Sequence, residues 1–160
     1  MKVHYYLLIV CLSYFCELNA QTRRAGNEQF DSFEQCVYID NLDQHLISDL
    51  FINTYYNKLK PSEYNSSQLI DSIHKRREVR LFSKMARSGY LYVNHFIMEN
   101  VGVSSCGIDR VKIVYVYNNR EVITYKDVLH LLRLRERFIR VIELLKDEQL
   151  GIITVYINTH

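Results

Sequence analysis

His95 is the residue of this chain best suited to acid–base chemistry. It lies in the run from Tyr90 to Met98, whose β-branched and aromatic residues predict a strand, on the same face as apolar residues at alternate positions. A histidine in such a pocket acts as a general acid or base when a carboxylate lies within reach. We name Asp40 as that carboxylate, so His95 and Asp40 are candidate pocket residues. The interpretation that we favour is a hydrogen-bonded histidine of the core or of a sheet edge.

Asp40 also belongs to a pair of carboxylates, because Asp43 follows it by about one turn of a predicted helix. Such a pair can face a cavity, and the alternative is a solvated helix face that includes Asp49. The histidines and cysteines show no metal-ligand spacing, and the sequence has no Gly-rich phosphate loop or nucleophile elbow. The sequence thus predicts no metal, no cofactor and no catalytic residue.

Arginines alternate with other residues from Arg133 to Arg137, and residues 75–77 form a second basic tract. In a strand, Arg133, Arg135 and Arg137 would line one face, which suits an acidic glycan or an anionic lipid headgroup. Charged strand faces usually serve solubility and protect sheet edges, and this is the interpretation that we favour. The formal net charge of +2 is too small to attract a polyanion at long range, so we expect no nucleic-acid partner.

Tyrosine is abundant, with 13 residues in a chain that has no tryptophan. As strand residues, Tyr90 and Tyr92 would form one aromatic row, and Tyr115 and Tyr117 another. Rows that face outward would contact a protein or a carbohydrate, whereas rows that face inward would belong to the core.

Residues 1–20 have the pattern of a secretory signal peptide. Lys2 precedes an apolar run that is too short for a membrane span, and small or tolerated residues precede a cleavage site after Ala20. We therefore predict a secreted, extracellular protein with a loose tail at 21–29 and a single domain at 30–160. No later stretch is apolar enough to span a membrane.

Export determines how the cysteines and one asparagine are interpreted. Cys11 and Cys16 leave with the signal peptide, so Cys36 and Cys106 are expected to form a disulfide, with two separate free thiols as the alternative. Asn65 begins an Asn-Ser-Ser sequon, which predicts a surface position and glycosylation.

The elements that would hold these residues follow from hydrophobic periodicity. We expect helices at 32–51 (one, or two broken near Asn41) and from Ser66 to Ile73, and strands at 54–56, 79–84, 90–98 and 151–157. A hairpin is predicted for 111–117 and 120–125, with its turn at Asn118-Asn119. Residues 127–145 fit either one helix or a helix at 127–132 followed by a strand at 137–144. The predicted fold is α+β, with N-terminal helices packed on a curved, mostly antiparallel sheet.

A weak internal repeat favours the second interpretation of 127–145. Apolar positions in 69–79 correspond to those in 128–138, and positions in 89–93 correspond to those in 151–155. A helix, a strand, a turn and a strand would then occur twice.

The order of these elements resembles that of a nuclear transport factor 2-like domain. The resemblance covers about residues 30–122: a helix ending at Leu50-Phe51, a short strand at 54–56, a helix through Leu69-Ile70, and long antiparallel strands. It implies a cone-shaped α+β domain with a pocket at its open end, where some members are isomerases or dehydratases and many only bind ligands.

On these grounds we predict a secreted, non-catalytic binding or interaction module for an unknown extracellular protein or small ligand. One alternative is a small cone-pocket enzyme that uses His95 with a carboxylate. The other is a secreted effector that acts on another cell through its tyrosine and arginine faces.

Overall fold

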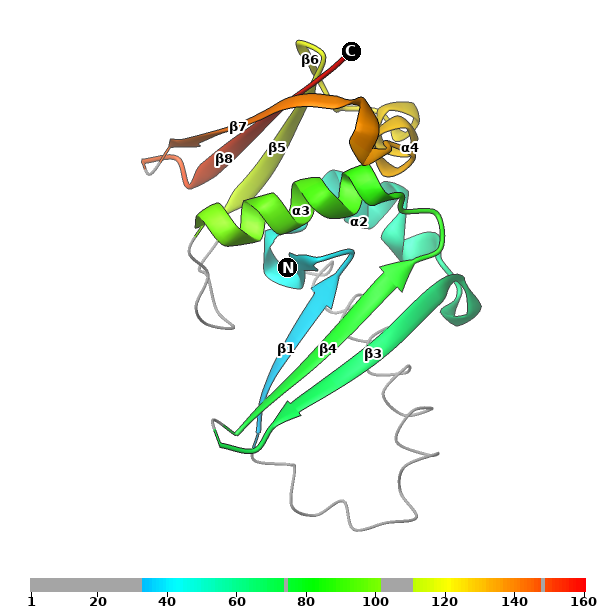
Figure 1. Cartoon of the computed structure of the whole chain (residues 1–160), viewed down its shortest axis with the longest axis vertical. Coiled ribbons are helices and arrows are strands. Elements are labelled where there is room, and N and C mark those ends of the chain that lie inside the picture. The colour runs from blue at the N-terminus through cyan, green and yellow to red at the C-terminus, as the bar shows by residue number, and fades with distance from the viewer. Residues whose placement is uncertain (1–32, 74, 102–110, 148) are drawn as a thin grey trace.

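The structure is a computed structural model that describes residues 33–73, 75–101, 111–147 and 149–160. Within these residues, two four-stranded sheets lie at opposite ends of the molecule, with α-helices between them (Figure 1). The predicted α+β class is confirmed, with two mixed sheets rather than a single curved one.

The first sheet has the strand order β2-β1-β4-β3. It comprises β1 (Glu34–Ile39), β2 (Leu42–Asp43), β3 (Tyr64–Asp71) and β4 (Arg76–Ser83). The central strands β1 and β4 are parallel, and the outer strands β2 and β3 pair antiparallel to them. Asp40 and Asn41 form the β1–β2 turn at φ 50° and 68°, a left-handed conformation that Asp and Asn tolerate better than most residues.

The second sheet repeats this arrangement in the order β6-β5-β8-β7. It comprises β5 (Lys112–Tyr117), β6 (Arg120–Glu121), β7 (Ile139–Asp147) and β8 (Ile152–Thr159). Its central strands β5 and β8 are again parallel and its outer strands antiparallel. Asn118 and Asn119 form the equivalent turn at φ 48° and 63°.

Along the chain, each half has two strands, then a helix, then two more strands, and a third helix connects the two halves. The helices are α2 (Asp49–Thr54), α4 (Tyr125–Leu132) and the connecting α3 (Ser88–Val101). Short 3-10 turns complete the chain: η2 (Gln44–Leu46), η3 (Tyr56–Lys58), η4 (Pro61–Glu63) and η5 (Glu136–Phe138). The order of helix, strand, turn and strand therefore does occur twice, but the predicted residue correspondence was wrong, because residues 69–71 lie in β3 whereas residues 128–132 lie in α4.

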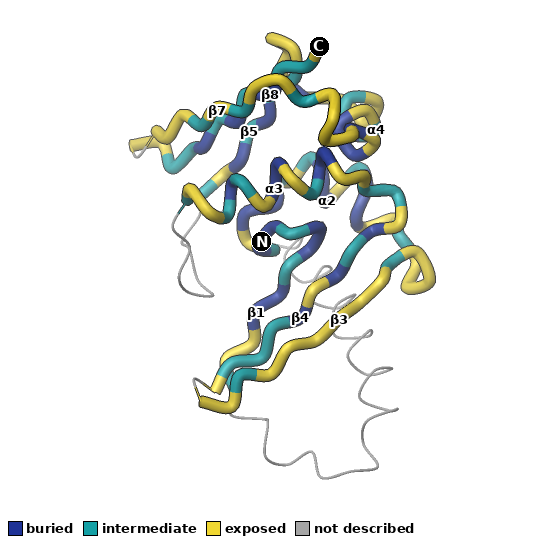
Figure 2. Tube along the Cα trace, in the orientation of Figure 1, coloured by how far each residue is buried: buried dark blue, intermediate teal, exposed yellow. Residues whose placement is uncertain are grey.

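The helices and the inner faces of both sheets share one hydrophobic core. At its centre the ring of Phe51 from α2 stacks on that of Tyr90 from α3, with centroids 5.8 Å apart, and lies 5.2 Å from the ring of Tyr115 from β5. Aromatic pairs at such distances add to the stabilisation from area burial alone. Figure 2 shows that burial concentrates around α3, whereas the edge strand β3 is exposed along most of its length.

Several predicted elements are confirmed. They are the strand at 79–84, the helix and strand of the second interpretation of 127–145, and the last strand. The hairpin after residue 111 is confirmed with a shorter second strand, since β6 covers Arg120–Glu121 and not 120–125. The start of α4 has a capping box, in which Thr124 and Asp127 bond each other's backbone N–H. The helix was predicted from its apolar spacing, and the capping box sets its start at Tyr125, two residues before the predicted one.

Three other predictions were wrong. Residues 32–51 contain β1, a turn, β2, η2 and the start of α2 rather than a continuous helix, because the β-rich run at 36–39 ends at a turn-forming Asp-Asn pair. Residues 66–71 lie in the exposed strand β3, and residues 54–56 lie at the junction of α2 and η3.

The predicted strand at 90–98 is part of α3. Its buried residues are Gly89, Tyr90, Val93, Asn94 and Ile97, and this spacing is helical, so burial of this face overrides the β propensity of the run. None of the helices within the described residues is long and apolar enough to span a membrane.

Candidate functional site

A groove of about 550 Å³ lies where the first half of the chain meets the segment after α4. Lys84, Arg87, Arg133 and Arg135 supply its positive charge. We call it the arginine groove. Its remaining lining residues are Tyr55, Leu59, Glu63 and Met85.

Backbone hydrogen bonds bring the cations together from positions about fifty residues apart in the chain. The N–H of Arg87 donates to the carbonyl of Leu132 at 2.8 Å, and that of Gly89 donates to the carbonyl of Leu134 at 3.0 Å. These bonds dock the start of α3 onto the segment after α4. They therefore place Arg87 beside the same hollow as Arg133 and Arg135.

Gly89 permits this close approach because it has no Cβ. A Cβ at this position would lie 2.7 Å from the backbone carbon of Arg135 and 2.8 Å from the backbone carbon and oxygen of Leu134. Such distances require the backbones to separate. The arginine groove thus depends on a glycine that does not line it.

The cations of the groove have no ionic partners within the described residues. Ion pairs there involve Arg76 and Arg80 with Glu78, and His95 with Glu99. Lys84, Arg87, Arg133 and Arg135 are all exposed and make no side-chain hydrogen bond or salt bridge in this part of the chain. Positive charge is therefore gathered in a concave site without neutralisation, which focuses the field on an incoming anion.

The one carboxylate that lines the groove is already engaged. Glu63 Oε2 accepts a hydrogen bond from the backbone N–H of Lys60 at 2.7 Å, as part of the turn at η4. The backbone N–H of Lys84 in turn donates to the carbonyl of Glu63 at 2.9 Å. Glu63 thus helps to form the wall of the groove and offsets only part of its charge.

Tyr55 lies against the groove with only 4% of its surface exposed. Its ring meets that of Tyr56 edge-on, with centroids 5.0 Å apart. Its buried hydroxyl lies near Ser83 but makes no hydrogen bond of standard geometry within the described residues. Burial raises the pKa of Tyr55 to about 12, so the hydroxyl keeps its proton and remains a donor at neutral pH.

Asp40 lies behind Tyr55 in a buried polar network. Its Oδ1 accepts from the backbone N–H of Ser83 at 2.6 Å, and its Oδ2 accepts from the Ser83 hydroxyl at 2.6 Å and from the Tyr56 hydroxyl at 2.9 Å. Burial raises the pKa of Asp40 to about 6, against the opposing effect of these hydrogen bonds. Both oxygens are satisfied, so Asp40 has a structural role.

The network continues through α3 to the second sheet. Asn94 donates from Nδ2 to the carbonyl of Asp40 at 2.8 Å, and its Oδ1 accepts from the hydroxyl of Tyr115 at 3.0 Å. The hydroxyls of Tyr56 and Tyr90 lie 3.2 Å apart. The two halves of the fold are therefore joined by polar contacts as well as by the apolar core.

The predicted pocket of His95 and Asp40 does not form. His95 is exposed on the outer face of α3, where its Nε2 lies 3.2 Å from Oε1 of Glu99 one turn later. Asp40 is fully buried on the inner side. The reason is the helical period of α3, which turns Asn94 rather than His95 towards Asp40.

Of the two predicted tyrosine rows, Tyr115 and Tyr117 form an inward one on the core face of β5, whereas the row of Tyr90 and Tyr92 is wrong because both lie in α3. Tyr90 and Tyr115 are buried in the core, whereas Tyr92 is exposed on the other side of α3. Asp43 is buried and accepts a hydrogen bond from the N–H of His45 as the cap of η2, so it does not pair with Asp40 across a cavity.

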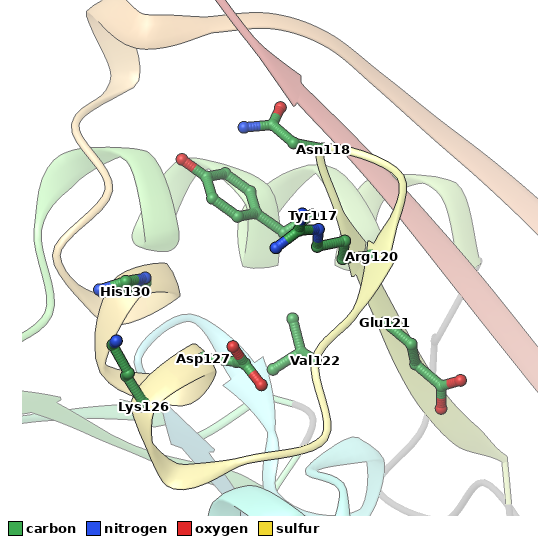
Figure 3. Close-up of a pocket in the computed structure, with 8 residues that line it drawn as sticks. All are labelled: Tyr117, Asn118, Arg120, Glu121, Val122, Lys126, Asp127 and His130. Carbon is green, nitrogen blue, oxygen red and sulfur yellow. The ribbon is translucent and has the colours of Figure 1, made fainter.

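A second hollow of about 480 Å³ lies between the β5–β6 hairpin and α4 (Figure 3). Figure 3 shows Tyr117 and Arg120 on the hairpin side, with Lys126, Asp127 and His130 on α4. Hydrogen bonds from Thr124 lower the pKa of Asp127 and hold its carboxylate in the capping box. Glu121 also lines this hollow, so its charges are mixed and it is the weaker candidate.

The structure brings two of the predicted arginines, Arg133 and Arg135, into one groove, but on the irregular segment after α4 instead of on a strand. Sequence reasoning missed Lys84, Arg87 and Tyr55, because their proximity depends on long-range backbone pairing. The described residues contain no group of three His, Cys, Asp or Glu side chains placed to hold a metal ion.

Two predicted modifications can be located in part. Cys36 is buried in β1, and its Sγ accepts a hydrogen bond from Arg76 Nε at 3.1 Å. Cys106 lies outside the described residues, as do residues 1–29, so the disulfide and the signal peptide stay predictions. Asn65 is exposed on the edge strand β3, the kind of position that glycosylation requires.

No family model, curated protein or solved structure matches this chain. The resemblance to nuclear transport factor 2-like domains therefore stays a prediction from the order of the sequence elements.

Proposed function

We propose that this protein is a secreted, non-catalytic binding module that holds a negatively charged ligand in the arginine groove. The observation that carries the proposal is the gathering of Lys84, Arg87, Arg133 and Arg135 around one hollow without ionic partners in the described residues. An anion in the groove would receive charge-assisted hydrogen bonds, which are stronger than bonds between neutral groups.

The electrostatic repulsion among the clustered cations also supports the proposal. Like charges held close together repel one another, and solvent screens this repulsion only in part in a concave site. Two backbone hydrogen bonds and the lack of a side chain at Gly89 nevertheless hold the two arginine-bearing segments together. A bound anion would offset this repulsion and would stabilise the folded state by mass action.

The alternative of a cone-pocket enzyme has less support. It required His95 in an enclosed cavity with a carboxylate, and His95 instead faces solvent beside Glu99. The alternative of an effector that acts through tyrosine and arginine faces has less support as well, because Tyr90 and Tyr115 are buried and only Tyr92 of the first pair is exposed.

A titration with a sulfated disaccharide tests the proposal. We expect the NMR signals of the Arg87, Arg133 and Arg135 Nε–H groups to shift together, and binding by the Arg133→Ala variant to be about fivefold weaker. Arg140→Ala is the matched control, because Arg140 is exposed on β7 outside the groove and its loss changes the net charge equally. Binding that weakens equally in both variants, or shifts that avoid the groove, would contradict the proposal.

A further inference from the structure

Two further hollows adjoin the arginine groove, and Arg135 lines all three. One has a volume of about 570 Å³ and reaches along η5 to Arg137. The other has a volume of about 310 Å³ and reaches from Arg133 to Phe138 at the end of β8. The concave surface therefore continues beyond the groove in two directions from one arginine.

Positive charge follows this surface. Arg137 adds a fifth cation to the four of the groove, while Glu63 and Glu136 are the carboxylates that line it. The guanidinium of Arg137 lies over the ring of Phe138, 4.9 Å from its centroid, and makes no ion pair within the described residues. His130 and His160 also line the hollow that contains Phe138.

The cations are spread over the walls of three hollows instead of converging on one point. A single small anion in the groove would contact some of them and leave Arg137 unused. A chain with several negative groups along its length would reach all of them. The shape of the site thus favours an extended polyanion over a compact one.

The hollow beside Phe138 indicates which chemical group of the ligand would lie between its negative charges. Phe138 exposes 45% of its surface there, next to Tyr117 and to Thr159 and its hydroxyl. A sugar ring presents apolar C–H faces and a rim of hydroxyls, which match an aromatic ring and its polar neighbours.

Granting the proposed function, on which this step rests, we infer that the ligand is a sulfated or carboxylated polysaccharide chain. It runs from the arginine groove across Arg135 towards Arg137 and Phe138. The predicted export of the protein favours an extracellular polysaccharide over a nucleic acid.

The test compares heparin-derived oligosaccharides of two to twelve sugar units by calorimetry with the purified full-length secreted protein. We expect affinity to rise with chain length well beyond the roughly sixfold that repeated identical sites on a dodecasaccharide would give. Arg137→Ala should leave the affinity for the disaccharide unchanged and weaken that for the dodecasaccharide about fivefold, with a shallower salt dependence.

Two controls separate this inference from the proposed function. Arg133→Ala should weaken binding of both ligands, and Arg140→Ala should weaken neither; equal melting temperatures would show that the variants fold. If the disaccharide binds in the groove and longer chains gain nothing, or if Arg137→Ala has no effect, the extended site is wrong while the groove stands. If neither ligand binds, both proposals fail.

The same assay distinguishes other polyanions. Linear polyphosphate, a single-stranded oligonucleotide and phosphatidylserine vesicles should each bind more weakly than the dodecasaccharide at equal negative charge, since none offers a chain of pyranose rings to Phe138. Equal or tighter binding of any of them would overturn the polysaccharide assignment.

Discussion

In each half of the molecule, the residue that follows the first central strand hydrogen bonds to the end of the parallel strand beside it. We call this group of hydrogen bonds a latch; it is buried in one half and exposed in the other. In the first half, Asp40 follows β1, its N–H donates to the carbonyl of Leu81, and its carboxylate accepts from the N–H and hydroxyl of Ser83. In the second half, Asn118 follows β5, its N–H donates to the carbonyl of Ile157, and its Oδ1 accepts from the N–H and hydroxyl of Thr159.

The difference between the two latches lies in their surroundings. Asp40 and Ser83 are buried under α3, and Asp40 also accepts a hydrogen bond from the Tyr56 hydroxyl, whereas Asn118 is exposed to solvent. The same short polar residue in a left-handed turn therefore closes a parallel strand pair in both halves. In the first half alone, the residue of the latch also takes part in the polar network that joins the two halves.

The largest expected effect comes from removing the two latches in turn. At pH 5, we expect Asp40→Ala to lower the free energy of unfolding by about 3 kcal/mol, because the Ser83 N–H and the Tyr56 hydroxyl lose their partner in the interior. Asn118→Ala should cost about 1 kcal/mol or less, since water replaces the lost bonds there. Urea denaturation measures both values, and equal losses would show that burial does not distinguish the latches.

The second prediction concerns pH, because only the buried latch carries a carboxyl group. The pKa of Asp40 is raised from its ordinary value of 3.8 to about 6 by burial, so the folded state binds this proton more tightly than the unfolded state. The contribution of Asp40 to stability is therefore fully present below about pH 4 and is lost as the pH rises to about 6. The loss amounts to at most roughly 3 kcal/mol.

The measurement is the difference in unfolding free energy between the wild-type protein and Asp40→Asn at several pH values from 4 to 7. Comparing the two proteins matters because the pKa of Asp127 is lowered by the capping box, which gives an opposite pH dependence that both share. We expect the difference to shift in favour of the variant as the pH rises. A difference that stays constant across this window would mean that Asp40 titrates normally.

The latches also show how far the sequence alone leads. The turn at Asn118-Asn119 could be predicted because turn residues act locally, and the helix at 127–132 because its apolar residues recur at helical spacing. The equivalent turn at Asp40-Asn41 was missed, since apolar residues on both sides of it mimic helical spacing. Burial, which the sequence does not display, determined the outcome in the first half.

The same limit applies to the site. The alternation of Arg133, Arg135 and Arg137 is visible in the sequence, and it led to the suggestion of an anionic partner. Lys84 and Arg87 join them only because the start of α3 docks on the segment after α4 through backbone bonds. His95 was placed in a pocket because a β-rich run was interpreted without the burial pattern that makes it a helix.

The third prediction concerns the contact that joins the halves at the groove. We expect Gly89→Ala to lower the free energy of unfolding by about 2 kcal/mol, because the new Cβ forces the start of α3 away from the backbone of Leu134 and Arg135. The affinity for the sulfated disaccharide should fall as well. Ser88→Ala, the matched control one residue earlier, loses a 3.3 Å bond to the N–H of Glu136 and should change both quantities little.

The smallest expected effect returns to the latches and removes only their hydroxyls. Ser83→Ala keeps the backbone bond to Asp40 but deletes the 2.6 Å bond to Oδ2, so we expect a loss of about 1 to 2 kcal/mol in unfolding free energy. Thr159→Ala keeps the corresponding backbone bond to Asn118 and should cost about 0.5 kcal/mol or less, because water reaches that turn. Ser83→Thr is a further control, since it retains the hydroxyl and tests space alone. If Thr159→Ala lowered the unfolding free energy more than Ser83→Ala, the exposed latch would contribute more to its strand pair than the buried one. The main role of the Asp40 carboxylate would then be its contact with Tyr56 and α3.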